Sequence, residues 1–107
     1  MNEPADAGPP APCAPGDGRV ARVLEIINSK GLHARASARF VQTVEKFDAE
    51  VTVTRGAETV GGTSIMGLMM LSAGQGTSIK VAACGPQAAE VMTALEALVG
   101  SGFGEEE

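Results

Sequence analysis

The chain has 107 residues, a formal net charge of −5, 44% hydrophobic residues and only 3% aromatic residues. This length predicts a single domain, and the acidic balance argues against nucleic acid as a partner, because phosphate backbones favour basic surfaces. No apolar run is long enough to span a bilayer, and the N-terminus lacks the pattern of a secretory signal. We therefore expect a cytoplasmic protein without membrane insertion.

The two ends of the chain differ from its middle. Residues 1–18 hold five of the six prolines and are predicted to be a disordered, Pro/Ala-rich extension. Residues 19–100 are predicted to form the folded domain and residues 101–107 an acidic tail, frayed from Phe103 onward. Cys13 and Cys84 form no CxxC pair, and one histidine cannot complete a usual zinc site. We therefore expect two free thiols, with a disulfide as the less favoured alternative, and no metal or cofactor.

Hydrophobic periodicity predicts seven elements between the two ends. Apolar and polar residues alternate in the segments predicted as strands, and apolar residues recur at helical spacing in those predicted as helices. In chain order these are a strand at 23–27, a helix at 34–46, strands at 51–54 and 59–60, a helix at 65–71, a strand at 78–83 and a helix from 86 to about 100. The result is an α+β fold, βαββαβα, in which helices cover one face of a four-stranded sheet.

The single histidine of the chain lies where the first helix is expected to begin. It stands in Gly31-Leu32-His33-Ala34-Arg35, two residues before an arginine. A helix start exposes unpaired N–H groups and the positive end of the macrodipole, so it favours a bound anion. An imidazole with a reference pKa of about 6.5 also has a substantial neutral, nucleophilic fraction near pH 7. The plainer interpretation is a capping or surface histidine without chemistry.

Two motifs together resemble a known family. Gly31-Leu32-His33-Ala34-Arg35 is followed about thirty residues later by Thr63-Ser64-Ile65-Met66-Gly67-Leu68. In this order they resemble HPr, the histidine-containing phosphocarrier of the bacterial phosphoenolpyruvate-dependent phosphotransferase system. The resemblance runs from about residue 19 to residue 99. It implies an open-faced β-sandwich with a mostly antiparallel sheet, and a phosphoryl carrier rather than an enzyme.

The resemblance also implies the partners and the site. Enzyme I would donate a phosphoryl group to Nδ1 of His33, giving a pros-phosphohistidine intermediate, and an EIIA-type protein would accept it. Arg35 would stabilise the phosphate through charge-assisted hydrogen bonds. The family often has proline where this chain has Ala36, so we expect an altered affinity or rate. The chain is expected to act as a monomer, in either sugar uptake or a nitrogen-related regulatory branch.

Ser64 is expected to cap the short second helix. Its surroundings resemble the regulatory phosphoserine site of HPr proteins that are substrates of an HPr kinase/phosphorylase. On the same helix, Ile65, Met66 and Met69 are predicted to be exposed and to contact partners, with Arg39 as part of a charged rim.

Two alternatives to the carrier stay open. One is a regulatory interaction module that acts mainly through phosphorylation of Ser64. Relatives of that kind tend to lack the histidine, which counts against this alternative. The other is a structural or interaction protein that shares only the fold.

Overall fold

The computed structural model describes residues 20–104. The predicted extension at 1–18, Cys13 and the three final glutamates lie outside the described residues. The elements are β1 (Val20–Glu25), α1 (Ala34–Val44), β2 (Glu50–Arg55), β3 (Glu58–Gly61), α2 (Ile65–Met70), β4 (Ser78–Cys84), α3 (Ala88–Gly100) and a 3₁₀ turn (Gly102–Gly104). Every expected element is present, in the predicted order.

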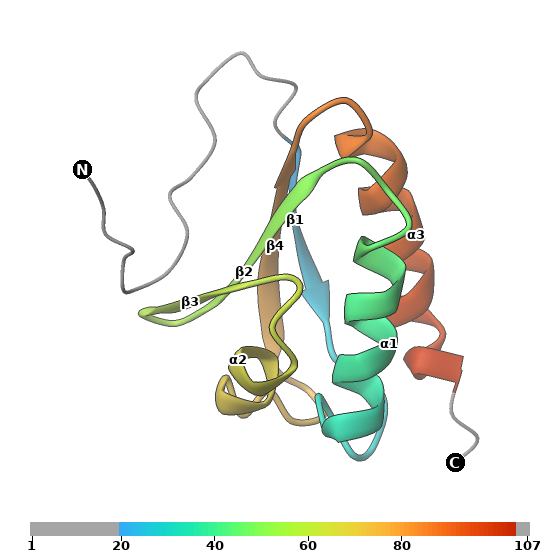
Figure 1. The fold of residues 1–107 in the computed structure, drawn as a ribbon. Helices are drawn as coiled ribbons and strands as arrows, with labels where there is room; N and C mark the ends of the chain where they lie inside the picture. Colours follow the sequence, from blue (N-terminus) through green and yellow to red (C-terminus); the bar gives the residue numbers. More distant parts are fainter. Residues whose placement is uncertain (1–19, 105–107) are drawn as a thin grey trace.

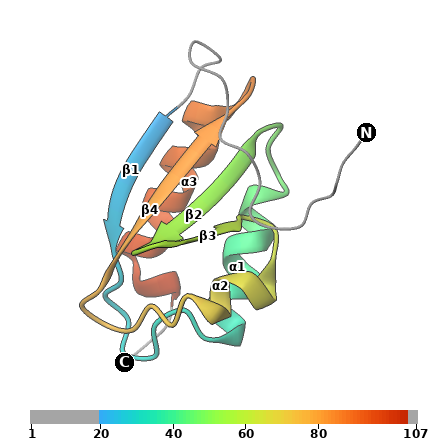
Figure 2. The ribbon, with the colours of Figure 1, turned by 90° about the vertical axis from the view of Figure 1, so that its left-hand side faces the viewer.

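The four strands form one sheet in the order β1-β4-β2-β3, and all three neighbouring pairs are antiparallel. Figure 1 shows α1 and α3 side by side on one face of this sheet, while Figure 2 shows the strands from the other side, on which neither of these helices lies. The open-faced α+β architecture predicted from the sequence is therefore confirmed. β4 lies between β1 and β2, so the core is built around the last strand to appear in the chain.

The core lies between the sheet and the two long helices. α1 buries one apolar stripe at helical spacing, and the facing strands bury alternate residues. The fully buried members include Ala36, Phe40, Val53, Val81, Val91 and Leu95. The helix ends at Val44, two residues before its predicted end. The N–H groups of Lys46 and Phe47 bond three residues back, to Thr43 at 3.2 Å and Val44 at 3.1 Å, instead of four. Phe47 still packs against the core from outside the helix.

Residues 102–104 are more ordered than the sequence pattern indicates. Phe103 was expected in a frayed tail, but its side chain is 0% exposed and its φ is +61°. Burying a phenylalanine ring contributes about 1.5–3 kcal/mol, whereas the left-handed conformation costs about 1–2 kcal/mol. Burial therefore offsets the backbone cost, and the expectation of fraying is wrong for this residue.

Cys84 at the end of β4 is disulfide-bonded. The expectation of a free thiol is therefore wrong for this residue. Bond formation depends on the distance between two Cα atoms in the folded chain, and sequence spacing alone does not give that distance.

Candidate functional site

His33 is the N-cap residue of α1. Its backbone is extended, with φ −79° and ψ −175°, and its carbonyl accepts the first helical hydrogen bond from the N–H of Ser37 at 2.8 Å. The imidazole Nδ1 accepts a hydrogen bond from the N–H of Arg35 at 3.3 Å, and the side chain is half-buried. The sequence prediction of a histidine at a helix start is confirmed.

This hydrogen bond defines what the ring can do chemically. A ring nitrogen that accepts a hydrogen bond carries no proton, and its lone pair points toward the donor. The Nδ1 lone pair is therefore directed toward the first N–H groups of α1. A phosphoryl group bonded to Nδ1 would lie at the positive end of the helix, where its oxygens could accept the same N–H groups.

The loop before the histidine is closed by a buried asparagine. Nδ2 of Asn28 donates to the carbonyl of Gly31 at 2.9 Å, and the N–H of Gly31 donates back to the carbonyl of Asn28 at 3.1 Å. Asn28 is 1% exposed. The amino-acid pattern does not predict this bracing role. Its only signal is an asparagine in a turn segment, where the side chain often bonds nearby backbone.

The loop between α2 and β4 supports the histidine loop from the side. The N–H of Leu32 donates to the carbonyl of Ala73 at 2.9 Å, and Nε2 of Gln75 donates to the carbonyl of Ile27 at 3.0 Å. Gly31 has φ +63°, and a Cβ there would come within 2.8 Å of the Gly74 Cα. The site therefore consists of two loops in close backbone contact, the first of which leads into the start of α1.

Three cations lie in this region. Lys30, Arg35 and Arg39 are exposed, and the first turn of α1 has no acidic residue. Within residues 20–104 the only ion pair is Arg22 with Glu96, at 3.3 Å. Nη1 of Arg39 donates to the carbonyl of Phe103 at 2.8 Å, an interaction that the sequence pattern does not reveal. The local charge is therefore positive, although the whole chain is acidic.

Ala36 is the third residue of α1, where many relatives are expected to have proline. Its side chain is 0% exposed and belongs to the hydrophobic core. The effect of alanine here on affinity or rate stays a prediction.

Ser64 is the N-cap of α2, as predicted. Its Oγ accepts a hydrogen bond from the N–H of Gly67 at 3.0 Å, and the residue is exposed. A Cβ on Gly67 would lie 2.9 Å from this Oγ and 3.0 Å from the Cβ of Val60. A glycine at this position therefore lets the capped turn pack closely on β3.

α2 presents an apolar surface. Leu68 is 0% exposed, whereas the exposed fractions of the others are 40% for Ile65, 71% for Met66, 41% for Met69 and 69% for Met70. The predicted exposure of the first three is confirmed, and Met70 joins them. We call these four exposed side chains the α2 surface. α2 packs against α1 near the histidine end of that helix, as both ribbon views show.

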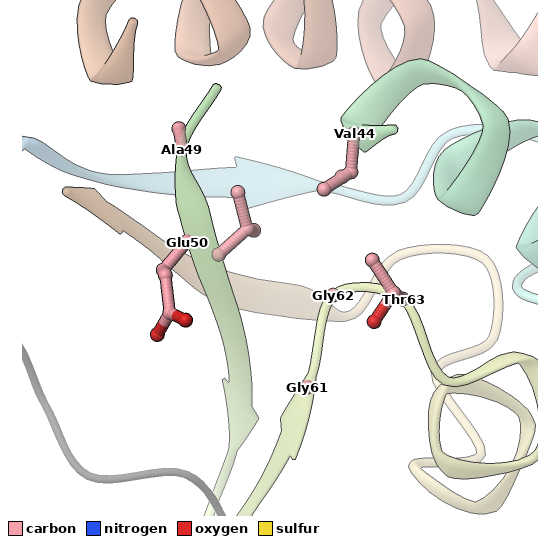
Figure 3. Close-up of a pocket in the computed structure, with 7 residues that line it drawn as sticks. Val44, Ala49, Glu50, Gly61, Gly62 and Thr63 are labelled. Atoms are coloured by element: carbon pink, nitrogen blue, oxygen red, sulfur yellow. The ribbon is translucent and has the colours of Figure 1, made fainter. Parts of the chain in front are cut away.

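A pocket of about 180 Å³ lies elsewhere, between the end of α1, the start of β2 and the end of β3. Figure 3 shows its lining, to which Glu50 and Thr63 bring polar side-chain atoms. Val44, at its edge, lies eleven residues after His33, or about 16 Å along the helix axis. The candidate site is therefore the exposed loop and helix start, not this pocket.

In the described part of the chain, no group of three or more His, Cys, Asp or Glu side chains could hold a metal ion. No helix among the described residues is long and apolar enough to cross a membrane. The site thus offers a nucleophilic side chain, backbone donors and cations. An open-faced sandwich with these groups at a helix start has what is needed by a class of protein in which a side chain itself carries a transferred anionic group.

Comparison with known proteins agrees with this class. The family model described as the phosphorylation site of the HPr component of the phosphotransferase system matches residues 20–101. The phosphocarrier protein HPr of Neisseria meningitidis serogroup A is 52% identical over 84 residues, which cover 78% of this chain and 94% of the relative. The chain belongs to the HPr family of the phosphotransferase system, whose members are phosphoryl carriers rather than enzymes.

Solved structures give the same result. HPr-C-His from Thermoanaerobacter tengcongensis is 42% identical, with a TM-score of 0.78, and the match covers 82% of this chain and 99% of that one. An HPr dimer from the same organism is 44% identical, with a TM-score of 0.65 and coverage of 77% and 94%. The recognition made from the two sequence motifs is therefore confirmed.

Proposed function

We propose that this phosphocarrier accepts a phosphoryl group on Nδ1 of His33 from phospho-Enzyme I and passes it to EIIA-type proteins in the cytoplasm. The observation that supports this most directly is the Nδ1 lone pair, directed toward the start of α1 by the Arg35 N–H. It is both the nucleophile and the position best placed for the product anion.

The transfer is an in-line displacement between two proteins. The Nδ1 lone pair forms the new N–P bond as the bond between phosphorus and the donor breaks, and the electron pair of that bond returns to the donor. In the second transfer His33 becomes the leaving group, and the same nitrogen recovers its lone pair. This chain holds no other reactant in either step.

The stabilisation of the phosphoryl group is moderate. A helix start contributes about 0.3–1 kcal/mol to an exposed anion and up to about 2 kcal/mol when the site is partly buried. The His33 side chain is half-buried, so we expect the contribution of the helix start to lie within this range. A carrier needs stabilisation of moderate size, because the phosphoryl group must stay bound during diffusion and then leave.

Incubation with Enzyme I and labelled phosphoenolpyruvate tests the proposal. We expect one label per chain, labile in acid and stable in base, as a phosphoramidate bond requires. Transfer of that label to an EIIA-type protein would complete the cycle. A protein that takes no label from Enzyme I or from a kinase with ATP would instead be an interaction protein that shares only the fold.

Replacement of Arg35 by alanine is expected to slow acceptance of the phosphoryl group roughly ten- to hundredfold, since one charge-assisted hydrogen bond contributes about 1.5–3 kcal/mol. Arg35→Lys should recover part of this, because lysine keeps the charge but not the two-pronged geometry. Arg22→Ala on β1 is the matched control. Equal rates in the Arg35 and Arg22 variants, measured by rapid quench, would remove Arg35 from the site.

Recognition of partners is proposed to use the α2 surface beside the histidine. Flexible methionines allow one surface to fit several proteins, and Arg39 adds charge beside it.

The protein is proposed to act as a monomer, which presents this surface to one partner at a time. Sedimentation velocity tests the monomeric state, and a dimer would contradict it.

Ser64 supports a second proposal, regulation by an HPr kinase/phosphorylase. Its hydroxyl is exposed, caps α2 and lies next to the α2 surface. A phosphate there would add about two negative charges beside the face that meets Enzyme I. An acid-stable label that requires ATP and the kinase, and is lost in Ser64→Ala, would support this site. If it were the only label, the protein would be a regulatory module.

The charge effect can be separated from the loss of the cap. Asp and Asn are both good N-cap residues, so Ser64→Asp and Ser64→Asn should both keep α2 folded. We expect the Asp variant to accept phosphate from Enzyme I about tenfold more slowly than the Asn variant, because it places a negative charge at the contact face. Equal rates in the two variants would contradict this regulatory proposal.

A further inference from the structure

The last carbonyl of α2 is held by a side chain from the sheet. Leu71 is the C-cap residue of α2, and Nη1 of Arg55, at the end of β2, donates to its carbonyl at 3.1 Å. Carbonyls at the C-terminus of a helix have no partner within the helix, and a cation is favoured beside them. Arg55 is half-buried, and within residues 20–104 it forms no ion pair. Its guanidinium therefore joins the end of β2 to the end of α2.

The residue that follows this carbonyl has a strained backbone. Ser72 has φ +54°, a left-handed conformation that is unfavourable for a residue with a Cβ. Its neighbours Leu71 and Ala73 are 3% and 2% exposed and belong to the core, whereas Ser72 itself is exposed. The chain thus turns sharply at an exposed residue while the residues on both sides of it stay buried.

This turn sets the direction of the Ala73 carbonyl. That carbonyl accepts the N–H of Leu32 at 2.9 Å, and the next residue in the chain is the histidine. The far end of the same loop has a separate support, because the N–H of Gly76 donates to the carbonyl of Ile26 at 2.8 Å. Both ribbon views show this loop at the same end of the domain as the start of α1 (Figures 1 and 2). The contact nearest the histidine is therefore the one that follows the strained turn.

We propose that Arg55 is a positioning residue for His33. By holding the Leu71 carbonyl, its guanidinium keeps Ser72 in the left-handed conformation that directs the Ala73 carbonyl toward the histidine loop. Without the guanidinium the turn relaxes, and the histidine loop loses the support next to the imidazole. This inference rests on the proposed function of His33 for its effect on phosphoryl transfer. The contact itself can be measured without a phosphoryl donor.

Amide hydrogen exchange in the unphosphorylated full chain tests the contact. In Arg55→Ala we expect the Leu32 N–H to exchange about tenfold faster, the size of effect that follows from losing one hydrogen bond from a charged donor. The Gly76 N–H should keep the parent rate, because its bond lies at the other end of the loop. Arg55→Lys should restore part of the protection, since an ammonium group can also donate to a carbonyl. Unchanged exchange at Leu32, or equal acceleration of both N–H groups, would overturn the inference.

The strained residue supplies a second test. Glycine adopts a positive φ readily, so in Ser72→Gly the turn no longer depends on the guanidinium. In that background we expect Arg55→Ala to raise the exchange rate of the Leu32 N–H by no more than about twofold, because the two changes act on one element. A full tenfold effect with glycine in place would overturn the coupling between the guanidinium and the turn.

Phosphoryl transfer tests the consequence for His33. Phosphoramidate serves as the donor, because a small molecule does not depend on docking of Enzyme I. We expect Arg55→Ala to accept phosphate about threefold more slowly, since a displaced nucleophile reacts less often. Arg22→Ala, which removes the same charge from the edge strand β1, should match the parent rate.

Two outcomes separate positioning from other roles. A rate that falls only with Enzyme I, and not with phosphoramidate, would make Arg55 a docking residue and overturn the inference. Faster exchange at Leu32 in a chain that takes no phosphate from any donor would support the contact and refute the carrier function.

Discussion

Replacement of His33 by alanine is expected to abolish the acid-labile label from Enzyme I and phosphoenolpyruvate entirely. The chain has no other histidine, so no second imidazole can accept the group. The same change removes the N-cap bond from Arg35 N–H to Nδ1, which is long at 3.3 Å. We therefore expect a stability loss near the lower end of the usual range for caps, about 0.5 kcal/mol.

His33→Asn separates these two effects. Asparagine is among the best N-cap residues and has no nucleophilic ring nitrogen. We expect this variant to unfold in urea at the same midpoint as the parent or slightly higher, yet to take no label. A label retained in either variant would place the acceptor on another residue, and a label lost only in the alanine variant would make the role of His33 structural.

The parts of the fold that sequence could predict are those encoded by local periodicity. Apolar residues at helical spacing identified α1, and alternation identified β2 and β4. Each buries the face that its pattern indicates; in α1 this includes Phe40 and Val44. The position of His33 at a helix start was predictable for the same reason, because the helical pattern begins immediately after it.

The supports of the site were not predictable in this way. The histidine loop is held by the carbonyl of Ala73, and every residue has a carbonyl, so side-chain identity gives no signal. The bond from Arg39 to Phe103 joins residues 64 positions apart. Phe103 follows the last helical repeat and precedes acidic residues, so its neighbours suggested fraying although its own ring favours burial. Such contacts depend on the three-dimensional path of the chain rather than on local pattern.

Family membership and geometry contribute different information about the site. The matching family model shows that the chain is an HPr-family phosphocarrier. The geometry adds that the Nδ1 lone pair already accepts the Arg35 N–H before any phosphate is present. The same N–H could therefore stabilise both the free ring and the proposed phosphorylated ring. Phosphorylation of His33 would then need little backbone rearrangement, provided that the loop before the histidine keeps its position.

Gly31→Ala is expected to disturb that position severely. A left-handed alanine costs about 1–2 kcal/mol, and the new Cβ would also collide with the backbone of Ala73 and Gly74. These atoms cannot move freely, because the Ala73 carbonyl accepts the N–H of Leu32. Overpacking of this kind costs a further 1–3 kcal/mol or so. We expect a total loss of about 2–5 kcal/mol in urea unfolding, together with slower acceptance of phosphate by His33.

Gly56→Ala provides the matched control for this prediction. Gly56 has φ +62°, nearly the same as the +63° of Gly31, but a Cβ there would meet nothing within 4 Å. This variant should lose only the conformational part, about 1–2 kcal/mol, and should accept phosphate at the parent rate. Equal destabilisation of the two variants would mean that the Ala73–Gly74 backbone yields to the new methyl group. The close contact between the two loops would then not be what holds His33 in place.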